Sequence, residues 1–195
     1  MIRLFVQRHG RFVADPAPED IDARLRDPEQ ETWLDITLEP HADPDTDPDA
    51  ALLRQEFGFH PLAIADAYRK RHPPKFDVFG PGALADGWPD GAADDPGGVT
   101  SKGLDSPCGP HYFLVVYAPR EGGRHGALRL DQLAVFIGRN YLVTVHRGEI
   151  PAIAETLRLW QLPGSPLGQT TGALAHALLD GIVDGYFPVL DHIAE

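Results

Sequence analysis

Apolar and polar positions along the chain predict a sheet whose strands are separated by helices. Short apolar or alternating runs predict strands at 2–6, 10–13, 32–37, 75–79, 111–118, 127–137 and 141–146. Helical spacing, proline positions and capping residues predict helices at 18–26, 48–57, 61–72, 151–161 and from 172 onward. We therefore expect an α/β fold with a mixed, largely antiparallel sheet of about six or seven strands and helices on both faces.

One helix of this pattern is defined well at both ends. Leu62, Ala65 and Tyr68 recur three apart, which places them on one side of a helix. Pro61 suits the first helical turn, where a missing N–H costs nothing. The prolines at 73 and 74 then end the helix, because a residue before proline is pushed out of the α region.

The segment 80–110 differs in composition from the rest of the chain. Thirteen of its 31 residues are Gly or Pro, and five more are Asp. Such a composition buries too little apolar surface to offset the entropy lost on ordering. We expect a mobile insertion between two strands that a short turn could join.

The last predicted helix is amphipathic. Its apolar positions are Leu179, Ile182, Val183, Tyr186, Leu190 and Ile193. Its acidic positions form a stripe of Asp180, Asp184, Asp191 and Glu195. Pro188 predicts a bend. The pattern is still running at Glu195, so we expect a boundary inside a longer helix.

Composition and charge narrow the classes of function. The 195 residues suffice for one domain with a core, and a net charge of −12 disfavours nucleic acid or anionic lipid as a partner. A single cysteine excludes an internal disulfide, and the N-terminus lacks the regions of a signal peptide. No uninterrupted apolar run approaches the roughly 18–20 residues that a membrane helix needs.

One tripeptide allows an enzymatic reading. Arg8-His9-Gly10 follows a predicted strand, as the catalytic Arg-His-Gly of histidine phosphatases does. The chain lacks the alternating parallel units of that fold, and it contains no HExxH, GxSxG, P-loop or CxxC motif. We therefore interpret the protein as a non-enzyme, with the phosphatase as the alternative from another class.

A set of motifs in a fixed order carries a family resemblance. Phe57-Gly58-Phe59-His60-Pro61-Leu62, Asp66-Ala67 and Pro74-Lys75 resemble the signature of the cytosolic domain of CorA-type divalent cation channels. The resemblance extends to 33–36, 112–119, 135–146 and 177–193, with a gap at 80–110. The family's Gly-Met-Asn pore signature and its two membrane helices are absent from this sequence.

The resemblance implies a regulatory function. It implies a cytosolic α/β domain over 1–168 and the start of a long stalk helix over 169–195, on the cytoplasmic side of the inner membrane, reaching the membrane only through helices beyond this chain. It implies a pentamer, and weak regulatory Mg²⁺ or Co²⁺ held between neighbouring copies by Asp66 and Asp180. Oxygen ligands suit these hard ions. Ala65 stands where the family often has a further carboxylate.

Two alternatives stay open within this reading. Asp66 and Asp180 are solvated surface residues if no ion binds. A related zinc transporter shares the implied fold, although the Pro74-Lys75 step favours CorA.

Overall fold

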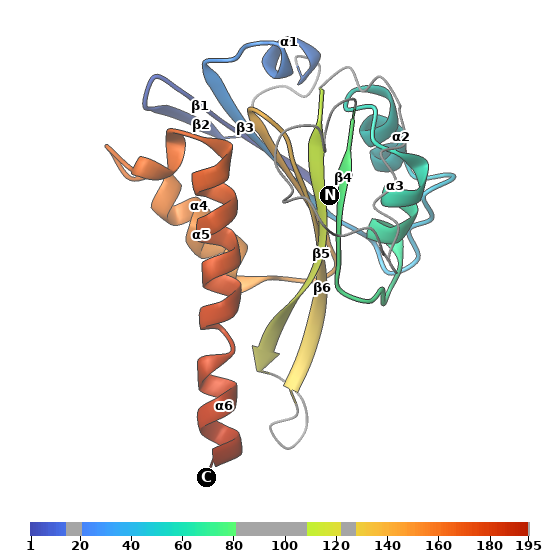
Figure 1. The fold of residues 1–195 in the computed structure, drawn as a ribbon, viewed down its shortest axis with the longest axis vertical. Coiled ribbons are helices and arrows are strands. Elements are labelled where there is room, and N and C mark those ends of the chain that lie inside the picture. Colours follow the sequence, from blue (N-terminus) through green and yellow to red (C-terminus); the bar gives the residue numbers. More distant parts are fainter. Residues whose placement is uncertain (15–20, 81–108, 122–127, 195) are drawn as a thin grey trace, which may run out of the picture.

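Seven strands form a single sheet in the computed structural model (Figure 1), which describes residues 1–14, 21–80, 109–121 and 128–194. The strands are β1 (Ile2–Arg8), β2 (Arg11–Ala14), β3 (Gln30–Thr37), β4 (Lys75–Phe79), β5 (His111–Glu121), β6 (Leu128–Ile137) and β7 (Tyr141–His146). The helices are α1 (Ile21–Leu25), α2 (Pro48–Gln55), α3 (Pro61–Tyr68), α4 (Pro151–Trp160), α5 (Thr171–Asp184) and α6 (Phe187–Ala194), with a 3₁₀ turn, η2 (Pro166–Gly168). The predicted α/β class is confirmed.

The strand order is β2-β1-β3-β7-β6-β5-β4, and only the β3–β7 pair is parallel. The prediction of a mixed, largely antiparallel sheet is therefore correct. Strands β1 and β2 form the expected hairpin, with His9 and Gly10 at positive φ in its turn. The other edge of the sheet is β4.

Helices cover both faces of the sheet (Figure 1). Helices α2 and α3 pack over one face, where Phe59 stacks on Phe136 with ring centroids 4.1 Å apart. Helices α4 and α5 pack over the other face, where Trp33 lies 6.1 Å from Trp160. Central strands such as β7 are therefore buried on both sides, which explains why β7 is apolar at most positions and buried at all six.

Local capping explains where α2 begins and stops. Asp47 accepts a hydrogen bond from the Asp49 N–H at 2.9 Å, and Pro48 occupies the first turn. Gly58 has φ of 64°, the left-handed conformation that ends helices. The helix stops at Gln55, two residues before the predicted end.

The face of α3 that packs on the sheet is not the side that the spacing of Leu62, Ala65 and Tyr68 marks. Leu62 is 56% exposed, whereas Ile64, Ala67 and Tyr68 are buried. The three-residue spacing of Leu62, Ala65 and Tyr68 was therefore a poor guide to the core. The i, i+3, i+4 set that begins at Ile64 fills it instead.

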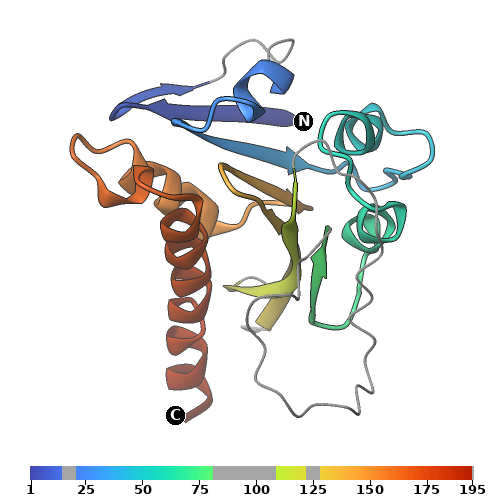
Figure 2. The same cartoon turned by 45° about the horizontal axis from the view of Figure 1, so that its top comes forward.

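Helices α5 and α6 continue one another and extend beyond the end of the sheet (Figure 2). The helix breaks at Gly185 and Tyr186, close to the bend predicted from Pro188. Leu174, Leu178 and Ile182 form its packed face. Of the predicted apolar positions, Ile182 is buried, whereas Val183 and Leu190 are each 57% exposed.

The expectation about membrane-length segments also changes. Within the described residues, Thr171–Leu190 is one helical stretch long and apolar enough to cross a membrane, and only 22% of it is buried. Two aspartates interrupt the stretch, which is why no uninterrupted apolar run was visible in the sequence. Length and composition alone support this reading, and core helices of soluble proteins meet the same criteria.

The Gly/Pro-rich insertion joins two strands that are direct neighbours. Phe79 at the end of β4 pairs with His111 at the start of β5. Its residues 81–108 lie outside the described part of the chain, as do 122–127, where a hairpin turn was predicted. Glu121 and Leu128 on either side of that turn are paired.

Candidate functional site

Asp66 lies in the last turn of α3, on the side that faces the sheet. The helix begins at Pro61, and His60 caps it because its Nδ1 accepts the Leu62 N–H at 3.1 Å. Asp66 is only 7% exposed. A carboxylate this buried needs partners to offset its loss of hydration.

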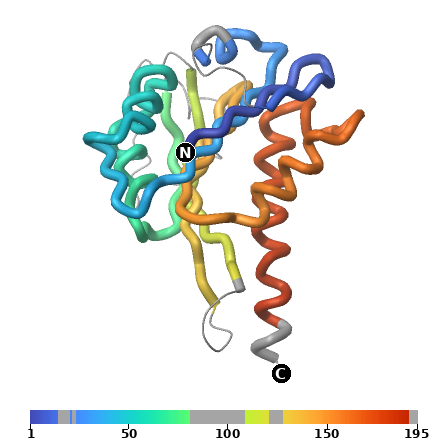
Figure 3. Tube along the Cα trace, turned by 180° about the vertical axis from the view of Figure 1, so that it is seen from behind, coloured from blue at the N-terminus to red at the C-terminus, as the bar shows by residue number. Residues whose placement is uncertain are grey.

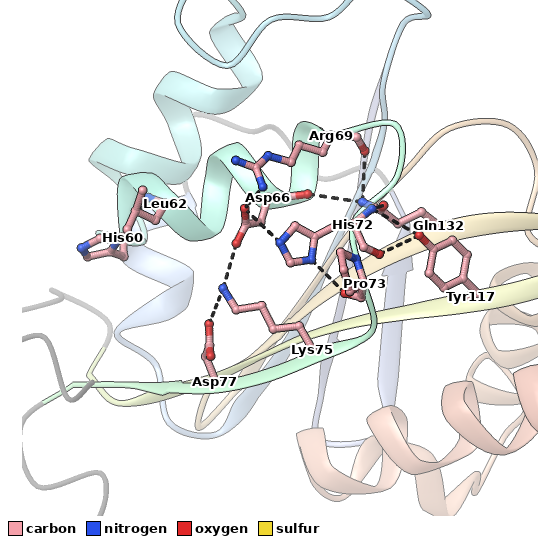
Figure 4. A network of polar contacts seen from close by, with 10 residues as sticks. All are labelled: His60, Leu62, Asp66, Arg69, His72, Pro73, Lys75, Asp77, Tyr117 and Gln132. Carbon is pink, nitrogen blue, oxygen red and sulfur yellow. Dashed lines mark hydrogen bonds and ion pairs between the residues drawn. The ribbon is translucent and has the colours of Figure 1, made fainter. Parts of the chain in front are cut away.

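Three basic side chains surround the Asp66 carboxylate (Figure 4). Lys75 Nζ donates to Oδ2 at 2.8 Å, while Arg69 Nη1 and His72 Nε2 each lie 3.3 Å from Oδ1. Lys75 also lies 2.8 Å from Asp77. Burial lowers the pKa of Lys75, but the hydrogen bonds and charges of the two aspartates outweigh burial, so the pKa is raised. The predicted metal ligand is therefore the centre of a charge network.

The turn after α3 is held to the sheet by further hydrogen bonds. The His72 N–H donates to Gln132 Oε1 at 2.7 Å, and Tyr117 Oη donates to the His72 carbonyl at 2.7 Å. Gln132 Nε2 in turn donates to the Arg69 carbonyl at 3.1 Å. Arg147 Nη2 donates to the Tyr68 carbonyl at 2.7 Å. These bonds pin the end of α3 to β5, β6 and the end of β7.

Asp180 lies on α5, which covers the other face of the sheet from α3 (Figure 1). It is exposed, as is Asp184 one turn later. The structure thus places Asp66 and Asp180 on opposite sides of one copy. Among the residues that the structure describes, no group of three or more His, Cys, Asp or Glu could hold a metal ion. Both residues can meet only across a contact between two copies.

The Arg8-His9-Gly10 turn does not form an enclosed site. His9 Nε2 lies 3.0 Å from Glu29, and both side chains are more than 60% exposed. Arg8 lies 3.4 Å from Asp27. The sheet around the turn is antiparallel, unlike the parallel units that the phosphatase alternative needs.

A second polar network lies inside the sheet, and the sequence did not predict it. Asp35 on β3 is fully buried and accepts hydrogen bonds from Arg3 Nη2 and Thr144 Oγ1, each at 2.6 Å. His146 Nε2 lies 3.0 Å from the same carboxylate. Trp33 Nε1 donates to Thr144 Oγ1 at 2.9 Å. The network ties β1, β3 and β7 together.

Two opposing effects set the protonation of Asp35. Burial raises the pKa of its carboxyl, but hydrogen bonds and charge from His146, with those from Thr144 and Arg3, leave that pKa lowered. The sequence signal for this network was the presence of polar residues among the apolar residues of the predicted strands. The sequence did not show which strands are neighbours, so the partners stayed hidden.

Comparison with known proteins shows what the chain is similar to. Residues 109–195, from β5 to the end of the chain, match the family model described as CorA-like Mg²⁺ transporter protein. This part of the chain is therefore similar to a CorA-like domain. Over 150 residues, 76% of the chain, it is 29% identical to "Putative metal ion transporter YfjQ" of Bacillus subtilis. The matched part of the chain covers 36% of that relative's length.

Three solved structures share the fold of this chain. The full-length CmaX protein matches with a TM-score of 0.64 at 15% identity, and the match covers all of this chain and 48% of CmaX. The soluble domain of CorA from Methanocaldococcus jannaschii matches with a TM-score of 0.60 at 15% identity, and the match covers all of this chain and 60% of the CorA chain. The ZntB cytoplasmic domain from Vibrio parahaemolyticus matches with a TM-score of 0.63 at 11% identity, and the match covers 98% of this chain and 61% of the ZntB chain.

Proposed function

We propose that this CorA-type domain is the cytosolic, divalent-ion-sensing part of a metal ion channel in a longer protein. The observation that carries the proposal is the α5–α6 helix. It lies within the stretch that matches the family model, and it extends past the end of the sheet with apolar side chains exposed. A helix of this kind can transmit a change in the domain to a membrane segment beyond Glu195, at the cytoplasmic side of the inner membrane.

The ions we propose are Mg²⁺ or Co²⁺, bound weakly between neighbouring copies of a homo-oligomer, a pentamer by family resemblance. Asp180 and Asp184 are exposed and one helical turn apart, so they can bind a partly hydrated ion directly. Asp66 becomes a ligand only when its ion pairs with Lys75, Arg69 and His72 open. An affinity in the millimolar range, about 4 kcal/mol, suits a sensor that must release its ion.

Zinc transport is the second candidate. The fold matches the ZntB cytoplasmic domain as well as it matches the CorA soluble domain, with TM-scores of 0.63 and 0.60. The exposed aspartates of α5 favour a hard ion, since Zn²⁺ prefers nitrogen and sulfur ligands.

Ion flux through the full-length channel that contains this domain tests the proposal. The variant Asp66→Ala/Asp180→Ala should conduct normally but close at a higher Mg²⁺ concentration than the parent. The matched control is Glu39→Ala/Asp45→Ala, which removes two exposed carboxylates elsewhere and should leave closure unchanged. Parallel flux measurements with Co²⁺ and Zn²⁺ separate the two candidates.

Two results would count against ion sensing. One is closure of the Asp66→Ala/Asp180→Ala channel at the parental Mg²⁺ concentration. The other is an equal shift in the Glu39→Ala/Asp45→Ala control, which would mean that Mg²⁺ acts through general screening of the domain's negative charge.

A further inference from the structure

One carboxylate beside the start of α5 has no part in the proposed ion sensing. Thr171 Oγ1 lies 2.5 Å from Glu31 Oε2 on β3 and 3.2 Å from the carbonyl oxygen of Arg139. Thr171 is the first residue of α5 and is only 2% exposed. The start of α5 lies beside the N-terminal strands of the sheet (Figures 1 and 3). Thr171 therefore joins α5 to β3 and to the turn between β6 and β7.

The three oxygen atoms in this contact have too few hydrogens if Glu31 is ionised. A threonine hydroxyl has one hydrogen, and a carbonyl oxygen or an ionised carboxylate can only accept. If Thr171 donates to Glu31, the contact with the Arg139 carbonyl has no hydrogen. If Thr171 donates to that carbonyl, the contact with Glu31 has none. A hydrogen on Glu31 satisfies both contacts, because the carboxyl then donates to Thr171 and Thr171 donates to Arg139.

The fold holds the two partners of Glu31 in place. The turn that carries Arg139 is closed by a hydrogen bond from the Gly138 N–H to the Tyr141 carbonyl at 2.9 Å. Thr171 belongs to a helix whose inner face is packed on the sheet. Acceptors that are fixed near one another favour the protonated form of a carboxyl among them.

The neighbours of Glu31 offer no charge that would favour its ionised form. Gln7, its cross-strand partner on β1, is only 7% exposed, and Gln7 Oε1 is buried without a hydrogen bond in the part of the chain that the structure describes. The side chain of Arg139 is exposed, and it forms no ion pair with Glu31 among the described residues. The site therefore contains oxygen acceptors and lacks a paired cation.

Charged residues on the surrounding elements are paired elsewhere or exposed. In the β1–β2 hairpin, Arg8 lies 3.4 Å from Asp27 and His9 lies 3.0 Å from Glu29. On α5 the first titratable residue is His176, which is exposed. The protonation of the Glu31 carboxyl is therefore set by its burial and by the contact with α5.

Burial and the hydrogen bond act on Glu31 in opposite directions. Burial raises the pKa of the carboxyl, and the hydrogen bond from Thr171 offsets only part of this effect, so the pKa is raised above 4.5, its ordinary value. Because the folded pKa lies above the unfolded pKa, the stability that the proton contributes is fully present below the unfolded pKa. It is lost as pH rises through the folded pKa.

We propose that Glu31 is a proton-binding site that anchors the start of α5 to the sheet. With the proton bound, two hydrogen bonds in series join Glu31, Thr171 and the Arg139 carbonyl. When the proton leaves to solvent water, one of the two contacts loses its hydrogen and the start of α5 loosens. Since α5 leads into α6, pH then acts on the helix that extends past the sheet. This site lies within one copy and does not depend on the proposed ion sensing.

NMR of the 195-residue chain over a range of pH tests the anchor. The carboxyl carbon of Glu31 should titrate at a higher pH in the folded chain than in the chain unfolded by urea. The N–H groups of Ala173 and Leu174 both donate to the Thr170 carbonyl in the first turn of α5. Their protection factors against hydrogen exchange should fall about 2- to 10-fold across the same pH range, the effect of losing one hydrogen bond.

Three variants and a control separate the proton from other causes. Glu31→Gln keeps a hydrogen donor without a charge, so the first turn of α5 should stay protected at every pH. Thr171→Val removes the hydroxyl and should give the low protection at every pH, whereas Thr171→Ser restores the hydroxyl and should regain the pH dependence. The control Glu39→Gln changes an exposed carboxylate and should keep the pH dependence of the parent.

Three results would overturn the proposal. One is a Glu31 carboxyl that titrates at the same pH in the folded and unfolded chains. Another is a Glu31→Gln chain that keeps the pH dependence of the parent. The third is a loss of protection that occurs in choline chloride but not in NaCl or KCl, which would mean that a metal cation rather than a proton occupies the site. Each of them leaves the ion-sensing proposal standing, because Asp66 and Asp180 are unchanged.

Discussion

Asp66→Asn distinguishes a structural carboxylate from an open metal ligand. The substitution keeps the shape of the side chain but removes the charge that Lys75, Arg69 and His72 neutralise. Exposed ion pairs contribute roughly 0.2–1 kcal/mol, and breaking a buried pair costs roughly 3–5 kcal/mol. Asp66 is 7% exposed while Lys75 remains about one-third accessible, so we expect a loss of about 2 kcal/mol.

The loss should appear without any divalent ion. For a chain of this length it corresponds to a melting temperature lower by about 4–8 °C. Urea and thermal unfolding in EDTA measure it. Asp180→Asn, which changes an exposed side chain, should stay within about 0.5 kcal/mol of the parent.

Divalent ions give the result that would refute this reasoning. If Asp66→Asn matches the parent in EDTA and is less stable only when Mg²⁺ is added, then the carboxylate binds the ion rather than the basic side chains. A double-mutant cycle with Lys75→Met should show a coupling of about 0.5–3 kcal/mol between Asp66 and Lys75 if they form the pair described here. A coupling near zero would contradict the network.

Three further predictions concern the fold. Asp35→Asn should lower the free energy of unfolding by about 3–5 kcal/mol at neutral pH. Because the pKa of Asp35 is lowered in the folded protein, the stability that its charge contributes is present above its unfolded pKa and is lost as pH falls through the folded pKa. The unfolding curves of parent and variant should therefore converge in acid. Leu178→Ala should cost about 2–5 kcal/mol in urea unfolding because Leu178, on the packed face of α5, is fully buried, whereas Leu190→Ala, at an exposed position, should cost under about 0.5 kcal/mol. Replacing 81–108 with a short Gly/Ser link should change the melting temperature by no more than a few degrees, because the flanking ends of β4 and β5 are already paired; a larger drop would show that the segment stabilises the core.

The contacts within the two polar networks could not be predicted from the sequence. The Asp35 network joins residues more than 100 positions apart, Asp35 with Thr144 and His146, because β3 and β7 are parallel neighbours. That pairing depends on the order of strands in the sheet, which no local pattern reveals. The Asp66 network is closer in sequence, since Lys75 is nine residues away. Its geometry still depends on how the turn at Pro73 and Pro74 directs β4 back toward α3.

The sequence by itself determined the type and approximate limits of the elements. Alternation, helical spacing, Asp47 as a cap, Gly58 as a stop and Pro188 near the helix bend are local properties, and local backbone energetics favours the same structure wherever the segment lies.

Only the tertiary structure decided which side of each helix faces the sheet and what each carboxylate contacts. Helix α3 has apolar residues on more than one side, and packing selected Ile64 over Leu62. The same rotation of α3 directed Asp66 toward Lys75, while packing of Leu178 on the opposite face left Asp180 in solvent. Side-chain spacing fixes relative directions within one helix, but burial of the largest apolar surface fixes the direction of the whole helix.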